Sequence, residues 1–94
     1  MDEELRELFQ RLDDTDDKLL ELFVYRLNLL KDIGALKKSR DMEIFNPERE
    51  RATVTRLLQN APEEFHASID AIYAKIFEVS GTIQNKKKRL WILF

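Results

Sequence analysis

The sequence of 94 residues has no cysteine, one histidine, two glycines and two prolines. The lack of cysteine excludes disulfides and thiolate metal sites, and a lone His66 argues against a zinc site built on histidines. So few glycines and prolines favour an all-helical fold. No apolar run reaches the ~18 residues of a membrane span, and the acidic N-terminus is unlike a signal peptide. We predict a cytoplasmic domain that does not associate with a membrane and binds no metal or cofactor.

The charges nearly balance, because 16 lysines and arginines face 18 aspartates and glutamates, for a formal net charge of −2. A nucleic-acid binder would usually carry a basic excess, so we predict no nucleic-acid partner. A chain of this length suits one domain. We assign residues 1–94 to it, with residues 89–94 as a tail or the start of a linker.

One long helix, expected over residues 3–38, organises the sequence. Its apolar residues recur at helical spacing in two adjacent rows, which are Leu5, Leu12, Leu19 and Ile33, and Phe9, Phe23 and Leu30. Arg26 takes the missing place in the first row, and Lys37 ends the second. The two cations share one helix face because 11 residues are close to a whole number of turns. Cations on a core-facing stripe need an anionic partner.

The length of this helix predicts a second copy of the chain. A helix of about 36 residues is about 54 Å long, whereas a compact domain of this size has a radius of gyration of about 12–13 Å. The remaining residues are too few to cover such a stripe. We therefore predict a homodimer in which the two long helices pair.

A second helix is expected over residues 47–60, after a polar loop over residues 39–46. Asn46 is a good helix cap, and Pro47 suits the first helical position. The inward face of this helix is thin and consists of Ala52, Val54, Leu57 and Leu58.

A third helix is expected from residue 62 or 63 to Lys87. Its apolar stripe steps by three or four residues through Phe65, Ile69, Ile72, Ile76 and Ile83. Ser80 interrupts the stripe, and Gln84 lies one turn further on. The tail that follows has a basic cluster and then an apolar end, Leu90–Phe94.

Six polar residues therefore stand where apolar side chains are expected, or beside a loop. They come from three helices and are Arg26, Lys37, Arg49, Glu50, Ser80 and Gln84. Each alone has a simple explanation, since long cations extend their charged ends into water and the others suit solvated helix faces. If the helices pack antiparallel, the six converge on one pocket with positive charge, one carboxylate and one amide. Such a pocket suits a small dianion.

The side chains of this pocket support few types of reaction. It has no cysteine nucleophile, histidine base or metal-ligand set, so acyl transfer and metal-dependent hydrolysis are unsupported. A reaction without a covalent intermediate fits best. Catalysis would then consist of positioning the substrate and stabilising charge in the transition state.

The order of these residues resembles the all-helical (AroQ-class) chorismate mutases. The segments that carry the resemblance are Thr15–Leu22 followed by Arg26, Ile33–Lys37, Asn46–Glu50, and the pair Ser80 and Gln84. No single segment is specific for the family, but the order and spacing of the segments across residues 5–88 are specific for it. The resemblance implies a three-helix chain in an intertwined dimer that rearranges chorismate to prephenate, on the route to phenylalanine and tyrosine.

The resemblance also implies roles for individual residues. The catalytic group is Lys37, which contacts a carboxylate and the ether oxygen whose bond breaks; Gln84, which hydrogen-bonds the same oxygen; and Glu50, which takes the ring hydroxyl. The substrate-binding group is Arg26 and Ser80, which hold a carboxylate; Arg49, which lines the pocket; and Asn46, which lies near the ring hydroxyl.

Two positions depart from the family pattern. Phe9 stands where the family has an arginine that reaches into the partner's site, and Arg6 lies one turn earlier. Asn46 replaces an aspartate, and although it still caps the helix, loss of a charged contact costs about 1.5–3 kcal/mol. Two alternatives to the enzyme stay open: a catalytically impaired dimerisation or regulatory module, and the related lyase that removes pyruvate from isochorismate.

Overall fold

The computed structural model describes residues 2–85, which form three α-helices and one short 3₁₀ helix. They are α1 (Glu3–Ser39), α2 (Pro47–Gln59), η1 (Glu63–Phe65) and α3 (His66–Gln84). No strand occurs in this part of the chain. The predicted all-helical fold with a very long first helix is therefore confirmed. None of these helices combines the length and the apolar character that a bilayer crossing requires.

Local hydrogen bonds fix both ends of α1. The Asp2 side chain accepts a hydrogen bond from the amide two residues on, at 2.9 Å, as expected of a cap. At the other end, the Met42 amide donates to the Lys37 carbonyl at 2.8 Å. The Asp41 amide donates to the Lys38 carbonyl at 3.3 Å. This is the Schellman arrangement, which needs a residue with positive φ, and Asp41 supplies it at 53°.

The start of α2 is as the sequence predicts. Asn46 Oδ1 accepts a hydrogen bond from the Arg49 amide at 3.1 Å, and Pro47 is the first residue of the helix. The helix ends at Gln59, one residue before the expected end. Of its expected inward face, Val54, Leu57 and Leu58 are half-buried, but Ala52 is exposed.

The boundaries of α3 differ from the expected ones. The segment begins as the 3₁₀ turn η1 and becomes α-helical at His66. It ends at Gln84, and Asn85 already lies in a turn, so the expected continuation of the helix through Asn85 is wrong. Residues 86 and 87, the rest of the expected extension, lie outside the described residues. Asparagine favours such a helix end because its short polar side chain competes for backbone hydrogen bonds. The basic cluster and the apolar tail noted in the sequence lie outside the described residues.

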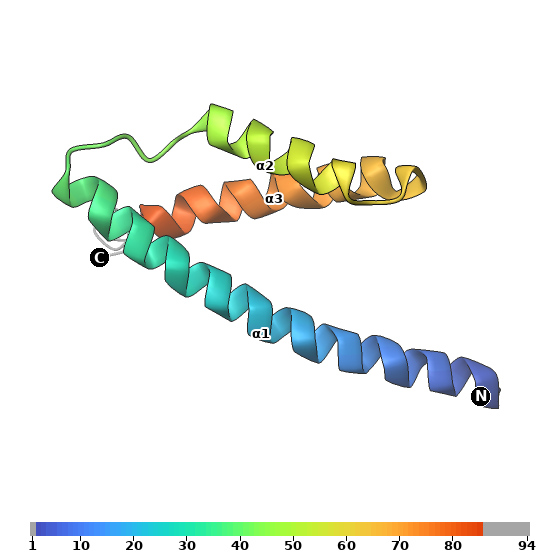
Figure 1. Ribbon diagram of the computed structural model, residues 1–94. Coiled ribbons are helices and arrows are strands. Elements are labelled where there is room, and N and C mark those ends of the chain that lie inside the picture. The colour runs from blue at the N-terminus through green and yellow to red at the C-terminus, as the bar shows by residue number, and fades with distance from the viewer. Residues whose placement is uncertain (1, 86–94) are drawn as a thin grey trace.

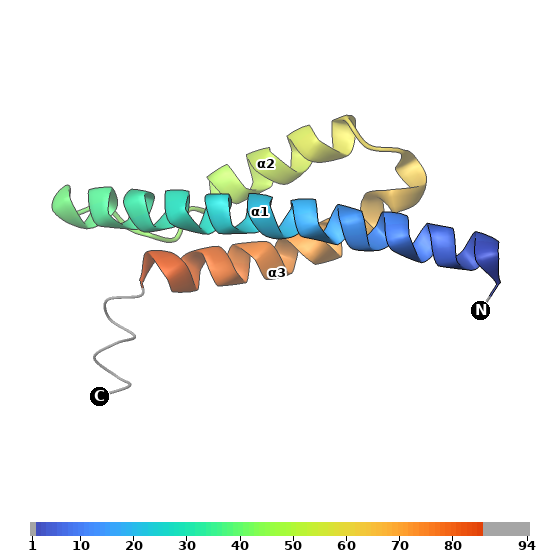
Figure 2. The same cartoon turned by 90° about the horizontal axis from the view of Figure 1, so that it is seen from below.

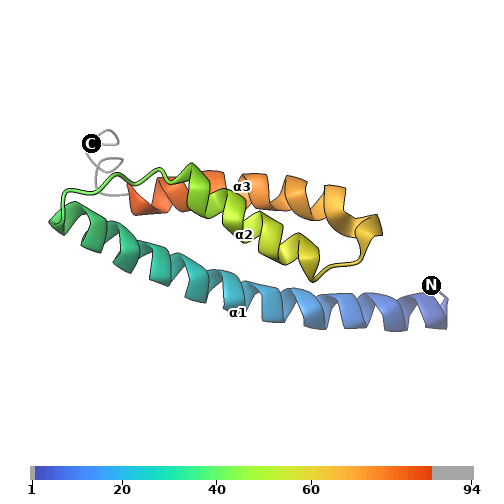
Figure 3. The same ribbon diagram turned by 45° about the horizontal axis from the view of Figure 1, so that its top comes forward.

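α3 packs against both α1 and α2. Figure 1 shows α3 beside the C-terminal half of α1, while the blue N-terminal half of α1 extends away from the other helices. In the view from below, α1 runs along the whole length of the molecule (Figure 2). Figure 3 shows α2 next to α3 and the segment 40–46 that leads from α1 into α2. The end of α1, the start of α2 and the end of α3 thus lie at one end of the molecule.

The described chain buries little apolar surface of its own. Within residues 2–85, Leu30 is the one large apolar residue that is buried, at 7% exposure. The large apolar residues of the N-terminal half of α1 are exposed: Leu5, Leu8, Phe9, Leu12, Leu19 and Leu20. The radius of gyration is 17.1 Å, compared with about 12 Å for a compact chain of this length. The N-terminal part of the predicted apolar seam of α1 is therefore not covered by the described part of its own chain.

Candidate active site

A hydrogen bond between Arg26 and Ser80 joins α1 to α3. The guanidinium donates from Nη1 to the hydroxyl oxygen, and the two atoms are 2.7 Å apart. The same hydroxyl donates to the Ile76 carbonyl at 2.7 Å, so serine is accommodated inside the helix with its donor and an acceptor position both used. Ser80 is 6% exposed and Arg26 is half-buried. Arg26 and Ser80, the polar residues that interrupt the apolar stripes of α1 and α3, are therefore hydrogen-bonded to each other.

Further along α1, Lys37 makes a second connection to α3. Its Nζ donates to Gln84 Oε1 at 3.0 Å and to the Ile44 carbonyl at 2.9 Å. Gln84 Nε2 donates in turn to the Ser80 carbonyl at 3.3 Å, which connects the two pairs along α3. An ammonium has three N–H groups, and one of them has no acceptor among residues 2–85.

Neither of these half-buried cations is paired with a carboxylate in the described chain. The ion pairs found between residues 2 and 85 involve other, well-exposed cations. Arg26 and Lys37 instead meet neutral oxygens of a hydroxyl, an amide and a carbonyl. Removing charge from water is costly unless an opposite charge compensates it. The site is therefore electrostatically suited to an anion.

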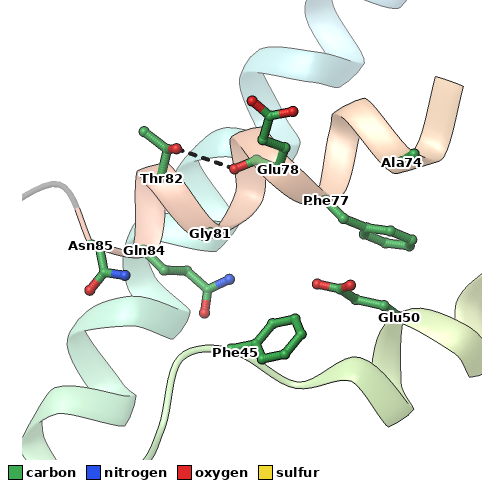
Figure 4. A pocket seen from close by; sticks show the side chains of 9 residues that line it. All are labelled: Phe45, Glu50, Ala74, Phe77, Glu78, Gly81, Thr82, Gln84 and Asn85. Atoms are coloured by element: carbon green, nitrogen blue, oxygen red, sulfur yellow. Dashed lines mark hydrogen bonds between the residues drawn. The ribbon is translucent and has the colours of Figure 1, made fainter. Parts of the chain in front are cut away.

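An open hollow of about 520 Å³ adjoins the Lys37–Gln84 pair. Its lining residues come from the segment before α2, from α2 and from α3, and they are Phe45, Glu50, Ala74, Phe77, Glu78, Gly81, Thr82, Gln84 and Asn85. In Figure 4 the side chains of Phe45, Glu50 and Gln84 point into this space. The Glu78 carboxylate points away from it. The hollow thus presents the Gln84 amide and the half-buried Glu50 carboxylate beside the aromatic side chains of Phe45 and Phe77.

Five of the predicted site residues line the hollow or are connected to it. Glu50 and Gln84 line it, and Lys37 donates to Gln84. The Ser80 carbonyl accepts from Gln84, and the Ser80 hydroxyl accepts from Arg26. Neither Ser80 nor Arg26 lines this hollow, and Arg26 lines a second one between α1 and α3.

Two other predicted residues lie apart from these five. Asn46 uses its side chain to cap α2. Arg49 is exposed, does not line the hollow, and its side chain has no hydrogen bond or ion pair within residues 2–85.

Two features of the site were not predicted. The Ile44 carbonyl that holds Lys37 is a backbone group, so the amino-acid sequence carries no signal for it. Phe45 does carry a signal, because it is a large aromatic residue in a connecting segment and directly precedes the Asn46 cap. An aromatic residue at that place indicates a contact with another part of the molecule or with a ligand.

The described residues form an all-helical protein with a site in which two half-buried cations have neutral partners, an arrangement suited to a small anion. Among residues 2–85, no three potential metal ligands lie close enough to hold a metal ion. The polar side chains of the site are the arginine, lysine, serine, amide and carboxylate groups described above.

Similarity to known proteins identifies the family. The sequence model of the family described as "Chorismate mutase type II" matches residues 8–85. A chorismate mutase from Methanocaldococcus jannaschii is 33% identical over 79 residues, which cover 84% of this chain and 78% of that protein. A bifunctional chorismate mutase/prephenate dehydratase from Aquifex aeolicus is 31% identical over 91 residues, or 92% of this chain and 25% of that protein. No solved structure is significantly similar. The chain belongs to the chorismate mutase type II family.

Proposed function

We propose that this chain is an isomerase that rearranges chorismate to prephenate, as a step of phenylalanine and tyrosine biosynthesis in the cytoplasm. One observation carries the proposal: Arg26 and Lys37 are half-buried and have only neutral partners in the described chain. A carboxylate makes a stronger hydrogen bond to a cation than a neutral oxygen does. A substrate with two carboxylates gains this advantage twice, and membership of the family supports chorismate as that substrate.

Arg26 binds one carboxylate of the substrate in this proposal. The planar guanidinium presents parallel N–H groups that match a carboxylate, and only Nη1 is engaged with Ser80. Ser80 keeps the guanidinium in place, because its hydroxyl is fixed by the Ile76 carbonyl. The role of Ser80 is therefore to orient the arginine and to help seat the carboxylate.

Lys37 and Gln84 act at the bond that breaks. Lys37 shares its remaining N–H between the second carboxylate and the ether oxygen, in a bifurcated hydrogen bond. Gln84 Nε2 exchanges its long bond to the Ser80 carbonyl, at 3.3 Å, for a bond to the same ether oxygen. Negative charge grows on that oxygen as the carbon–oxygen bond lengthens. A hydrogen-bond donor directed at the developing charge contributes about 10²- to 10³-fold in rate.

Glu50 accepts a hydrogen bond from the ring hydroxyl, and its place in the hollow opposite Gln84 supports this role. Phe45 and Phe77 provide apolar contact for the ring. Arg49 and Asn46 have more distant roles, Arg49 at the edge of the pocket and Asn46 through the position of α2. The rearrangement transfers no group to the protein, so none of these residues needs to be a nucleophile.

The active form is proposed to be a homodimer. The exposed apolar row of α1 supports this, because a long apolar stripe is most simply covered by an identical chain. The 37 residues of α1 extend about 55 Å, so one helix is long enough to contribute to both halves of a paired molecule. In each half of the dimer, the C-terminal half of α1 from one chain would then lie beside the N-terminal half of α1 from the other chain.

The direct test is turnover of chorismate. Micromolar protein with millimolar chorismate is expected to accelerate the loss of its ultraviolet absorbance above the uncatalysed rate, and magnetic resonance of the mixture should identify prephenate. A parallel incubation with isochorismate tests the lyase alternative, which predicts release of free pyruvate from that substrate. No acceleration at all would overturn the proposed activity.

A second candidate is a module that keeps the fold without the chemistry. The observation that favours it is Phe9, a neutral residue that is 46% exposed on α1 at the position that the resemblance gives to a substrate-binding arginine. Calorimetry with a bicyclic mimic of the transition state separates the candidates. Binding without turnover indicates a sensor, and no binding indicates a scaffold.

A further inference from the structure

Gly34 is a buried residue of α1, one turn before Lys37. A Cβ atom added to it would lie 2.7 Å from the carbonyl oxygen of Gln84 and 2.8 Å from its Cα atom. Both are backbone atoms, so no rotation of a side chain relieves the overlap. The two helices approach this closely because residue 34 has no side chain.

Gln84 is thus held by α1 in two ways. Its backbone lies on Gly34, and its side chain accepts a hydrogen bond from Lys37 Nζ at 3.0 Å. Positions 34 and 37 are on the same face of α1 because they are three residues apart. Any shift of the Gln84 backbone away from Gly34 therefore also moves its amide relative to the lysine.

The other glycine of the chain gives a comparison within the same molecule. A Cβ atom on Gly81 would meet nothing within 4 Å. Packing within the described chain therefore does not require glycine at position 81, although glycine is less favourable than alanine inside a helix. At Gly34 the close approach of α3 supplies a packing reason for glycine.

We propose that Gly34 is a positioning residue, whose missing side chain sets the α1–α3 spacing that keeps Gln84 within hydrogen-bonding distance of Lys37. This inference rests on the proposed function, in which that pair acts on the ether oxygen. It adds a requirement on the backbone to the roles of the two side chains. Gly34 itself touches no reacting atom.

The test compares Gly34→Ala with Ala35→Gly, which makes the opposite change at the next, exposed position of α1. Gly34→Ala is expected to lower kcat by about 10- to 100-fold, as a misplacement of about 1 Å does. KM should change little, because Arg26 and Ser80 hold their carboxylate about two turns away along α1. Ala35→Gly should lower Tm and leave kcat unchanged. Gly81→Ala serves as a stability control, with Tm unchanged or higher.

A double-mutant cycle separates positioning from simple packing. In a Gln84→Ala background the amide that Gly34 positions is already absent, so Gly34→Ala should lower kcat far less than it does in the wild type. A purely structural role predicts the same factor in both backgrounds, and that result would overturn the inference. So would a folded Gly34→Ala enzyme with wild-type kcat.

The wild-type rate separates this inference from the proposed function. If the wild type does not turn over chorismate, the proposed function fails, and a crystal structure of Gly34→Ala then decides. The inference requires Lys37 Nζ and Gln84 Oε1 to be out of hydrogen-bond reach in that variant, and a retained bond overturns it. A Gly34→Ala chain that does not fold beside a folded Ala35→Gly chain also overturns it, because Gly34 would then determine the fold itself.

Discussion

Lys37 and Gln84 are 47 positions apart in the sequence, yet Lys37 Nζ donates to Gln84 Oε1 at 3.0 Å. The bond joins the last turns of α1 and α3. The ammonium is also held from a second direction, by the Ile44 carbonyl. Its position is thus set by three segments of the chain before any substrate binds, which is the condition for effective electrostatic catalysis.

Lys37→Ala is expected to lower kcat by at least about 10²- to 10³-fold, because it removes a donor aimed at the developing charge. Lys38→Ala is the matched control, since Lys38 is the exposed neighbour on the same helix and its loss should leave kcat unchanged. Steady-state rates of chorismate loss measure both. Wild-type kcat in Lys37→Ala would remove Lys37 from the mechanism.

Arg26→Lys keeps the charge but replaces the planar fork by a point charge. We expect KM for chorismate to rise by about tenfold or more, because a hydrogen bond to a charged group contributes about 1.5–3 kcal/mol. Arg56→Lys, at an exposed position of α2, should leave KM unchanged. Equal effects of the two substitutions would argue against a carboxylate at Arg26.

Leu12→Glu tests the proposed dimer. Leu12 is 54% exposed on the N-terminal half of α1, and a homodimer would bury it once in each chain. The dissociation constant of the dimer is expected to rise by at least about 100-fold, since each buried leucine contributes about 1.5–3 kcal/mol. Sedimentation equilibrium measures it, with Lys18→Glu on the polar side of the same helix as control. A monomeric wild type would contradict the dimer directly.

Asp41→Gly is expected to stabilise the fold. Asp41 has a φ of 53° in the turn that ends α1, a conformation that glycine adopts without steric cost and other residues do not. The free energy of unfolding should rise by about 0.5–1 kcal/mol, as measured by chemical denaturation. Asp32→Gly, in the helical part of α1, should lower it. A loss of stability in Asp41→Gly would mean that the carboxylate itself contributes to the turn.

Phe9→Arg tests the departure from the family pattern. If the missing arginine weakens substrate binding, this substitution should lower KM for chorismate. Gln10→Arg adds the same charge on a different face of α1 and should not. An unchanged or higher KM in Phe9→Arg would indicate that Arg6 or another group already supplies the contact.

Features that depend on local sequence were predicted well. The cap at Asn46 was identified because a cap is a property of a few neighbouring residues. The long first helix was identified because apolar residues recur at helical spacing along most of its length. The end of α3 was placed too late, since a basic stretch after Asn85 is compatible with a helix. Sequence periodicity alone does not define where such a helix stops.

The site was predictable where a polar residue took an apolar place. Arg26 and Ser80 each interrupt a stripe, and they turn out to be hydrogen-bonded to each other. Arg49 was expected in the pocket from its motif, but in the described chain it is exposed. The contact of Gly34 with the Gln84 backbone was not predictable, because it depends on how closely two helices approach. That distance is a property of the folded molecule.

The bond from Lys37 to the Ile44 carbonyl has an evolutionary consequence. Because the acceptor is a backbone oxygen, many different side chains at position 44 leave the hydrogen bond intact. Substitutions at this position therefore do not remove the acceptor of Lys37. An insertion or deletion between residues 40 and 46 is different, since it reroutes the chain and withdraws the oxygen. Selection is therefore expected to preserve the length of this segment more strictly than the identities of its amino acids.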